Sequence, residues 1–133
     1  MKHYEEAKLK EILAPASGDM SAEDFRRVGH EIIDWIADYS ENIERFPVLS
    51  PVEPDWLKDN LPKSAPENGE DFARVLRDVD KLILPAVTHW NHPNFHGLFS
   101  TSVSAAGIFG ELLSAAFDMK AMLWRTAPAS TEL

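Results

Sequence analysis

The sequence contains no cysteine, which excludes disulfide bonds and thiolate chemistry. A cysteine-free chain suits a reducing compartment, and we expect a cytoplasmic protein. The amino-terminal stretch carries too many charged side chains for the apolar core of a signal peptide. Since no apolar run approaches the roughly 20 residues that a membrane span requires, we expect no contact with a membrane.

Basic side chains are also scarce. The 133 residues include 13 Lys and Arg against 22 Asp and Glu, a formal net charge of −9. Such a chain repels polyanions unless basic residues cluster on one surface, and the basic doublet Arg26-Arg27 lies among acids. We therefore expect no nucleic acid partner. With 44% hydrophobic residues, the chain has the length of one domain and can bury a core.

Charge is particularly sparse in residues 86–133. The charged side chains there are Glu111, Asp118, Lys120, Arg125 and Glu132. Because charged residues normally cover a solvent-facing surface, and large apolar patches usually mark contacts, we expect other protein to cover this part.

The first half of the chain has the apolar spacing of helices. A short helix is expected over residues 2–13. Ser21 and Asp24 resemble a capping box at the start of a long helix that runs to about residue 45. Its apolar residues are spaced by threes and fours: Phe25, Val28, Ile32, Trp35, Ile36, Tyr39 and Ile43.

Five prolines in residues 46–67 predict an irregular connection, in which Asp55-Trp56-Leu57 can form one short helical turn. A third helix is expected at roughly 70–83, ended by Pro85. Residues 104–119 predict a further helix that is apolar nearly all round and therefore buried. Pro128 followed by an acid is typical of another helix start, so the chain reads as a fragment of a longer polypeptide.

The stretch THWNHPNFHGLFSTS, residues 88–102, is the candidate functional site. His89, His92 and His96 have the ligand type for zinc, but their spacing around a proline fits no single helical face. No acid or cysteine within the stretch adds a further ligand, so we expect no metal. Packing of the histidines and aromatic residues against a core, or a pocket wall, both remain open. The cluster 100–102 can likewise cap a helix or contact an anion.

Several stretches together resemble the amino-terminal region of the group II pyridoxal-phosphate-dependent decarboxylases. They are MSAEDFRRVGHEIIDWIADYSENIE, PVEPDWLKDNLP, DVDKLILPAVTHWNHPNFHGLFSTSVSAAGIFGELLSAAFDM and LWRTAPASTEL. The resemblance covers about residues 20–133 and points to the aromatic-L-amino-acid decarboxylase branch. Its most specific runs are THWNHPNF and TAPASTEL.

The resemblance implies a mainly α chain: the amino-terminal helical segment of a type I, aminotransferase-like α/β enzyme, truncated before its large domain. It also implies a homodimer formed through the amino-terminal helices. The expected parts are an arm at 1–20, a helical dimerisation segment at 21–85, an active-site-wall loop and buried helix at 86–124, and the start of the large pyridoxal-phosphate-binding domain at 125–133.

The resemblance also implies roles for individual residues. The substrate-side residues would be Trp90, Leu98, Phe99, Ser100 and Thr101. The family usually has tyrosine-phenylalanine-proline-threonine where this chain has residues 98–101, so the chain departs from the pattern at the first and third of these positions. Lys120 and Met122 occupy positions that reach into the partner's active site, where the family more often has aliphatic or aromatic residues.

No catalytic residue is expected in this chain. In the family a lysine directly after a histidine forms the Schiff base with pyridoxal 5'-phosphate, and no His-Lys pair occurs here. The expected function is therefore that of a dimerisation and pocket segment of an enzyme that converts an L-amino acid, expected to be aromatic, to an amine and carbon dioxide. The alternative is a non-catalytic helical protein that pairs with a decarboxylase subunit. Neither interpretation gives the chain activity by itself.

We predict that the isolated 133-residue chain forms oligomers or aggregates, because residues 86–133 lack a polar outer face. Size-exclusion chromatography with light scattering measures this directly. A monodisperse monomer that unfolds in one cooperative transition would contradict the expectation.

Overall fold

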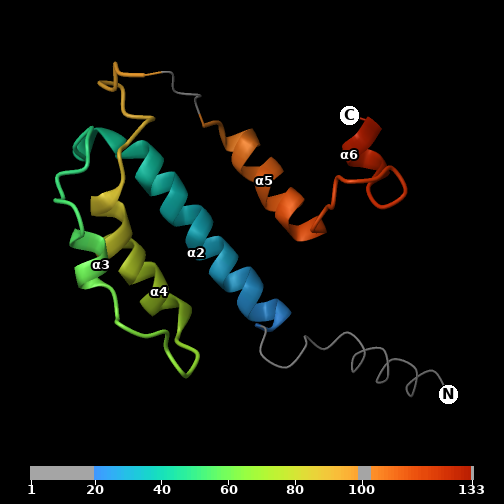
Figure 1. Cartoon of the computed structure of the whole chain (residues 1–133), viewed down its shortest axis with the longest axis horizontal. Coiled ribbons are helices and arrows are strands. Elements are labelled where there is room, and N and C mark those ends of the chain that lie inside the picture. The colour runs from blue at the N-terminus through green and yellow to red at the C-terminus, as the bar shows by residue number, and fades with distance from the viewer. Residues whose placement is uncertain (1–19, 99–102, 133) are drawn as a thin grey trace. The chain divides into compact units, whose positions relative to one another are not determined.

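The computed structural model describes residues 20–98 and 103–132, and these form helices joined by irregular connections (Figure 1). No β-strand occurs within those two ranges. The chain divides into two compact units, Met1–His89 and Trp90–Leu133. The helix expected at 2–13 falls outside the described residues. Among the described helices, none is both long and apolar enough to span a bilayer.

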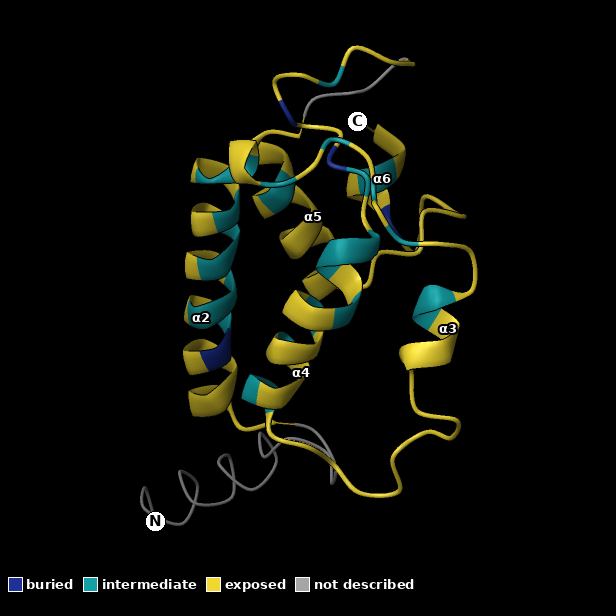
Figure 2. Ribbon diagram, turned by 90° about the vertical axis from the view of Figure 1, so that its left-hand side faces the viewer, coloured by how far each residue is buried: buried dark blue, intermediate teal, exposed yellow. Residues whose placement is uncertain are grey.

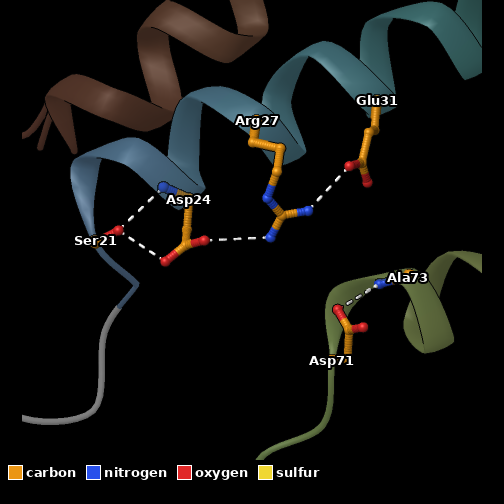
Figure 3. Close-up of polar contacts among 6 residues, drawn as sticks. All are labelled: Ser21, Asp24, Arg27, Glu31, Asp71 and Ala73. Atoms are coloured by element: carbon orange, nitrogen blue, oxygen red, sulfur yellow. Dashed lines mark hydrogen bonds and ion pairs between the residues drawn. The ribbon is translucent and has the colours of Figure 1, made fainter.

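The long helix α2, Ala22–Glu41, begins as its sequence predicts (Figure 3). Ser21 is the N-cap, and its Oγ accepts a hydrogen bond of 3.0 Å from the backbone N–H of Asp24. The same hydroxyl donates to the Asp24 carboxylate at 2.7 Å, and Arg27 lies 3.3 Å from that carboxylate. The carboxylate of Asp24 accepts hydrogen bonds from the hydroxyl of Ser21 and from the guanidinium of Arg27. Both lower the pKa of Asp24, and the bond from Ser21 has the larger effect. A 3-10 turn at Ile43–Arg45 follows α2, so the helical stretch ends where expected.

One side of α2 faces the rest of the first unit, and Figure 2 shows it as a teal band with one dark blue turn. The buried residue is Val28, with 4% of its surface exposed. The half-buried apolar residues of this face are Ile32, Trp35, Ile36 and Tyr39. This is the predicted stripe, except that its first member, Phe25, is 62% exposed. The apolar spacing therefore identified the packed face of the helix correctly.

The proline-rich connection contains the short helix α3, Trp56–Asn60. Its first two residues, Trp56 and Leu57, are half-buried, as expected for side chains that anchor the connection. The connection is also attached through Ser50, whose hydroxyl donates to the backbone carbonyl of Pro85 at 2.9 Å.

The third helical region begins with α4, Phe72–Asp78, capped by Asp71, whose carboxylate accepts from the N–H of Ala73 at 3.2 Å (Figure 3). It continues as a π-helical turn at Val79–Ile83 and a 3-10 turn at Leu84–Ala86. The position of the helix was predicted correctly, but its end was not, because Pro85 lies inside the last turn. Proline lacks an N–H, and the first residues of a helical turn do not use theirs.

The second unit contains α5, Ala105–Phe117, and α6, Pro128–Glu132. Ser104 caps α5 by accepting from the N–H of Gly107 at 3.0 Å, and Asp118 ends it in a left-handed conformation with φ 45°. Both helices lie where the sequence predicts them, with proline as the first residue of α6.

The expected burial of α5 does not occur within this chain. Of its residues only Ile108 is half-buried, and the others are exposed. The exposed large side chains are Phe109, Leu112, Leu113 and Phe117, with 49–67% of their surface accessible. An apolar helix is buried only if something covers it, and the described part of the chain supplies no cover. Burial by other protein stays a prediction.

Replacement of Ser21 by alanine should destabilise α2 by about 1 kcal/mol, because the first-turn N–H of Asp24 loses its acceptor. Native-state hydrogen exchange of the first-turn amides measures this local free energy. Ser21→Thr is the matched control, because it retains a capping hydroxyl. Equal exchange in both variants would show that the cap contributes nothing.

Candidate functional site

His89 is the most deeply buried of the described side chains, with 2% of its surface exposed. Its Nδ1 and the hydroxyl of Tyr39 in α2 share a hydrogen bond of 2.8 Å. Its backbone N–H donates to the carbonyl of Val48 at 3.0 Å. The ring of Phe46 stacks on the imidazole with centroids 5.0 Å apart. Side chain and backbone of this one residue thus connect α2 to the start of the proline-rich connection.

An aromatic row extends from this histidine along α2. The rings of Tyr39 and Trp35 stack with centroids 5.6 Å apart and planes within 4° of parallel. At the far end, the indole N–H of Trp35 donates to the carboxylate of Asp80 at 2.7 Å. The row therefore joins α2 to the third helical region at one end and to His89 at the other. Burial raises the pKa of Tyr39, so its hydroxyl keeps its proton at neutral pH.

His92 organises the turn that follows. It is 6% exposed, and its Nδ1 accepts a hydrogen bond of 3.0 Å from the backbone N–H of Asn94. An Nδ1 that accepts carries no proton, which places the proton of the neutral ring on Nε2. The carbonyl of His92 also accepts from the N–H of Phe95 at 2.9 Å. The ring of Phe95 packs on Trp90, with centroids 4.8 Å apart.

These contacts account for the two buried histidines of the motif. The Nδ1 atoms of His89 and His92 are both in hydrogen bonds, and His96 is exposed. Over residues 20–98 and 103–132, no three His, Cys, Asp or Glu side chains lie close enough together to hold a metal. Of the two interpretations left open, the described geometry favours packing for these histidines.

The structure locates only some of the predicted site residues. Trp90 and Leu98 are described and are 44% and 82% exposed, Leu98 with φ 53°. Phe99, Ser100 and Thr101 lie outside the described residues. A hydrogen bond joins residues that precede and follow these three: the N–H of Val103 donates to the side-chain carbonyl of Asn91 at 3.4 Å.

The two residues expected to reach a partner's active site are on the surface of the second unit. Met122 is 85% exposed. Lys120 is exposed as well, and its ammonium pairs with the carboxylate of Asp118. Because the partner's active site lies outside this chain, the role of these two residues stays a prediction.

Sequence reasoning did not predict the hydrogen bonds of Tyr39 and Asn91. Tyr39 was assigned only to the apolar stripe of a helix, and Asn91 was not selected at all. A polar atom at the end of an aromatic side chain on a buried face usually has a partner, and that rule points to Tyr39. No comparable signal marks Asn91.

The lysines in the described part of the chain do not suit attachment of pyridoxal phosphate. A lysine that forms a Schiff base needs a desolvated position, whereas the lysines in the described part of the chain are all exposed: Lys58, Lys63, Lys81 and Lys120. Lys120 in addition holds an ion pair. None of these four lysines has the desolvated position that Schiff-base formation requires.

Residues 54–133 match the family described as the pyridoxal-dependent decarboxylase conserved domain. The chain belongs to this family. A tyrosine decarboxylase of Papaver somniferum is 45% identical over 125 residues, which are 94% of this chain and 24% of the relative. A phenylacetaldehyde synthase of a Rosa hybrid cultivar is 48% identical over 114 residues, 86% of this chain and 22% of the relative.

The fold agrees with this membership of the decarboxylase family. A crystal structure of Catharanthus roseus tryptophan decarboxylase in complex with L-tryptophan matches with a TM-score of 0.78 and 42% identity. The match covers 85% of this chain and 24% of the solved one. The chain thus spans about a quarter of the length of the relatives it matches. The predictions of the family and of a mainly helical fold for this chain are confirmed.

Tyr39 should make the stability of the first unit depend on alkaline pH. Because its pKa is raised in the folded state, its contribution is complete below the unfolded pKa of about 10 and is lost as the pH rises through the folded pKa. Thermal unfolding of wild type and Tyr39→Phe between pH 8 and 11 measures this. The wild-type midpoint should fall faster above pH 10 than that of the variant, and parallel curves would refute the assignment.

Proposed function

We propose that this chain is the amino-terminal dimerisation and pocket segment of a pyridoxal-phosphate-dependent decarboxylase that converts an aromatic L-amino acid to an amine and carbon dioxide. The supporting observation is the family match over residues 54–133, joined to the TM-score of 0.78 with a tryptophan decarboxylase. The cofactor and its lysine would belong to parts of the enzyme outside this chain. The location proposed for the enzyme is the cytoplasm.

The part of this chain in the reaction would be to shape the substrate side of the pocket. Trp90 supplies a large aromatic surface that is held against Phe95 and remains 44% exposed. Such a surface suits the ring of an aromatic amino acid and excludes water around it. The hydroxyl of Thr101 would orient a polar group of the substrate. The neighbours Leu98, Phe99 and Ser100 would complete the wall.

Dimerisation would supply the missing cover. α5 exposes Leu112, Leu113 and Phe117, each with more than half of its surface accessible. Contiguous exposed apolar residues of this kind normally mark a protein contact. A second copy of the enzyme, together with its large domain, would bury α5 and receive Lys120 and Met122 near its active site.

A second product is also consistent with the comparisons. The phenylacetaldehyde synthase of the rose cultivar is 48% identical to this chain, against 45% for the tyrosine decarboxylase. This segment therefore does not discriminate between enzymes named for an amine-forming reaction and enzymes named for an aldehyde. The identity of the product separates the two functions.

The test uses the intact enzyme with pyridoxal phosphate. Tyrosine, 3,4-dihydroxyphenylalanine, tryptophan and phenylalanine are each supplied, and carbon dioxide, amine and aldehyde are measured. Release of carbon dioxide with one equivalent of amine supports the decarboxylase, and aldehyde in place of amine supports the synthase. No carbon dioxide from any of the four would overturn the proposal.

Thr101→Ala should lower kcat/KM about tenfold, since the loss of one hydrogen bond to a bound polar group costs on the order of 1.4 kcal/mol. Thr101→Ser is the matched control, because it retains the hydroxyl and should stay near the wild-type value. Unaltered kinetics in the alanine variant would remove Thr101 from the site.

A further inference from the structure

His89 is the last residue of the first unit, and the peptide bond that follows it leads directly to Trp90. It is held by two hydrogen bonds from different elements: one from its ring to Tyr39 at 2.8 Å, the other from its backbone to Val48 at 3.0 Å. Beyond it the chain is held differently. The turn at 92–95 is closed by hydrogen bonds among its own residues. The bonds at His89 therefore attach the residue that precedes Trp90 to α2 and to the proline-rich connection.

Tyr39 holds the side chain of His89, whereas Val48 holds its backbone. Its hydroxyl reaches Nδ1 of a ring that is 2% exposed, so removal of the hydroxyl takes a hydrogen-bond partner from a deeply buried imidazole. Phe46 packs on the imidazole and Trp35 on the phenol, which restricts both rings to one orientation. The side chain of His89 can then not rotate without breaking a buried hydrogen bond and two ring contacts.

We propose that Tyr39 is a positioning residue for substrate binding: its hydrogen bond to His89 fixes the backbone that carries Trp90, and so holds the aromatic wall in the geometry that the substrate requires. This rests on the proposed function, because it assumes that Trp90 lines the substrate site. Tyr39 itself does not touch the substrate. It acts through His89. A displacement of about 1 Å at a binding group lowers rate or affinity even when its cause lies far from the chemistry.

The aromatic row offers a matched comparison. Tyr39→Phe removes only the hydroxyl at the His89 end, while Asp80→Ala removes only the acceptor of the Trp35 indole at the other end. Both variants keep every ring of the row and each loses one hydrogen bond from it. A role in stability alone therefore predicts similar behaviour of the two variants, whereas a positioning role predicts that only the first affects the wall.

The experiment uses the intact enzyme with pyridoxal phosphate and has two readouts. Hydrogen exchange of peptides that cover residues 88–98 should be about fivefold faster in Tyr39→Phe than in wild type, the change expected when one neutral hydrogen bond no longer opposes local opening. It should be unchanged in Asp80→Ala. In steady-state kinetics, KM for the amino acid should rise about fivefold in Tyr39→Phe with kcat nearly constant, and neither should change in Asp80→Ala.

The outcomes separate the two proposals. Unchanged exchange at residues 88–98 in Tyr39→Phe overturns the positioning role, whatever the activity of the enzyme. Faster exchange with an unchanged KM also overturns it, because the wall then moves without consequence for the substrate. Equal effects of Tyr39→Phe and Asp80→Ala on KM assign the bond to general stability. A wild-type enzyme that releases no carbon dioxide overturns the proposed function itself, while the exchange measurement still reports whether the bond holds the segment.

Discussion

The buried hydrogen bond between Tyr39 and His89 is the contact on which the organisation of the first unit depends. The two residues are 50 positions apart, and the proline-rich connection and the third helical region lie between them in the chain. The imidazole is 2% exposed and the tyrosine is half-buried, so loss of this bond would remove a partner from a deeply buried ring. This restricts how the connection can pack on α2.

The longest helices of the two units differ in how they are covered. In the first unit, α2 presents one packed face and one charged face, as an amphipathic helix in contact with both protein and water should. In the second unit, α5 has apolar and small residues around its whole circumference and remains exposed. Within the described residues, one face of α2 is thus packed, whereas α5 is left exposed. The chain spans about a quarter of the length of the relatives that it matches in the pyridoxal-dependent decarboxylase family.

The histidine-rich motif illustrates how a pattern of residue types can suggest chemistry that the packing does not use. Three imidazoles within a short stretch resemble a set of metal ligands. In the structure, Nδ1 of His89 meets a tyrosine and Nδ1 of His92 meets a backbone amide, so each ring acts as a hydrogen-bonding member of a packed segment. The described histidines of the motif are thus accounted for by packing and hydrogen bonds, and a pocket wall at Trp90 is what we propose.

Local patterns in the sequence predict the described helices, the Ser21 cap and the packed face of α2, whereas the caps Asp71 and Ser104 were not predicted. These features depend on neighbours within about one helical turn, as with Ser21 and Asp24 or the threes and fours of the stripe. The termination of the third helical region was predicted less well, since its π-helical turn ends at Ile83 and a 3-10 turn continues to Ala86. Only the tertiary structure decided that Tyr39 bonds His89 and that Asn91 bonds Val103. Contacts of that kind are set by how separated segments meet in space, and no local pattern of residues encodes the distance between them.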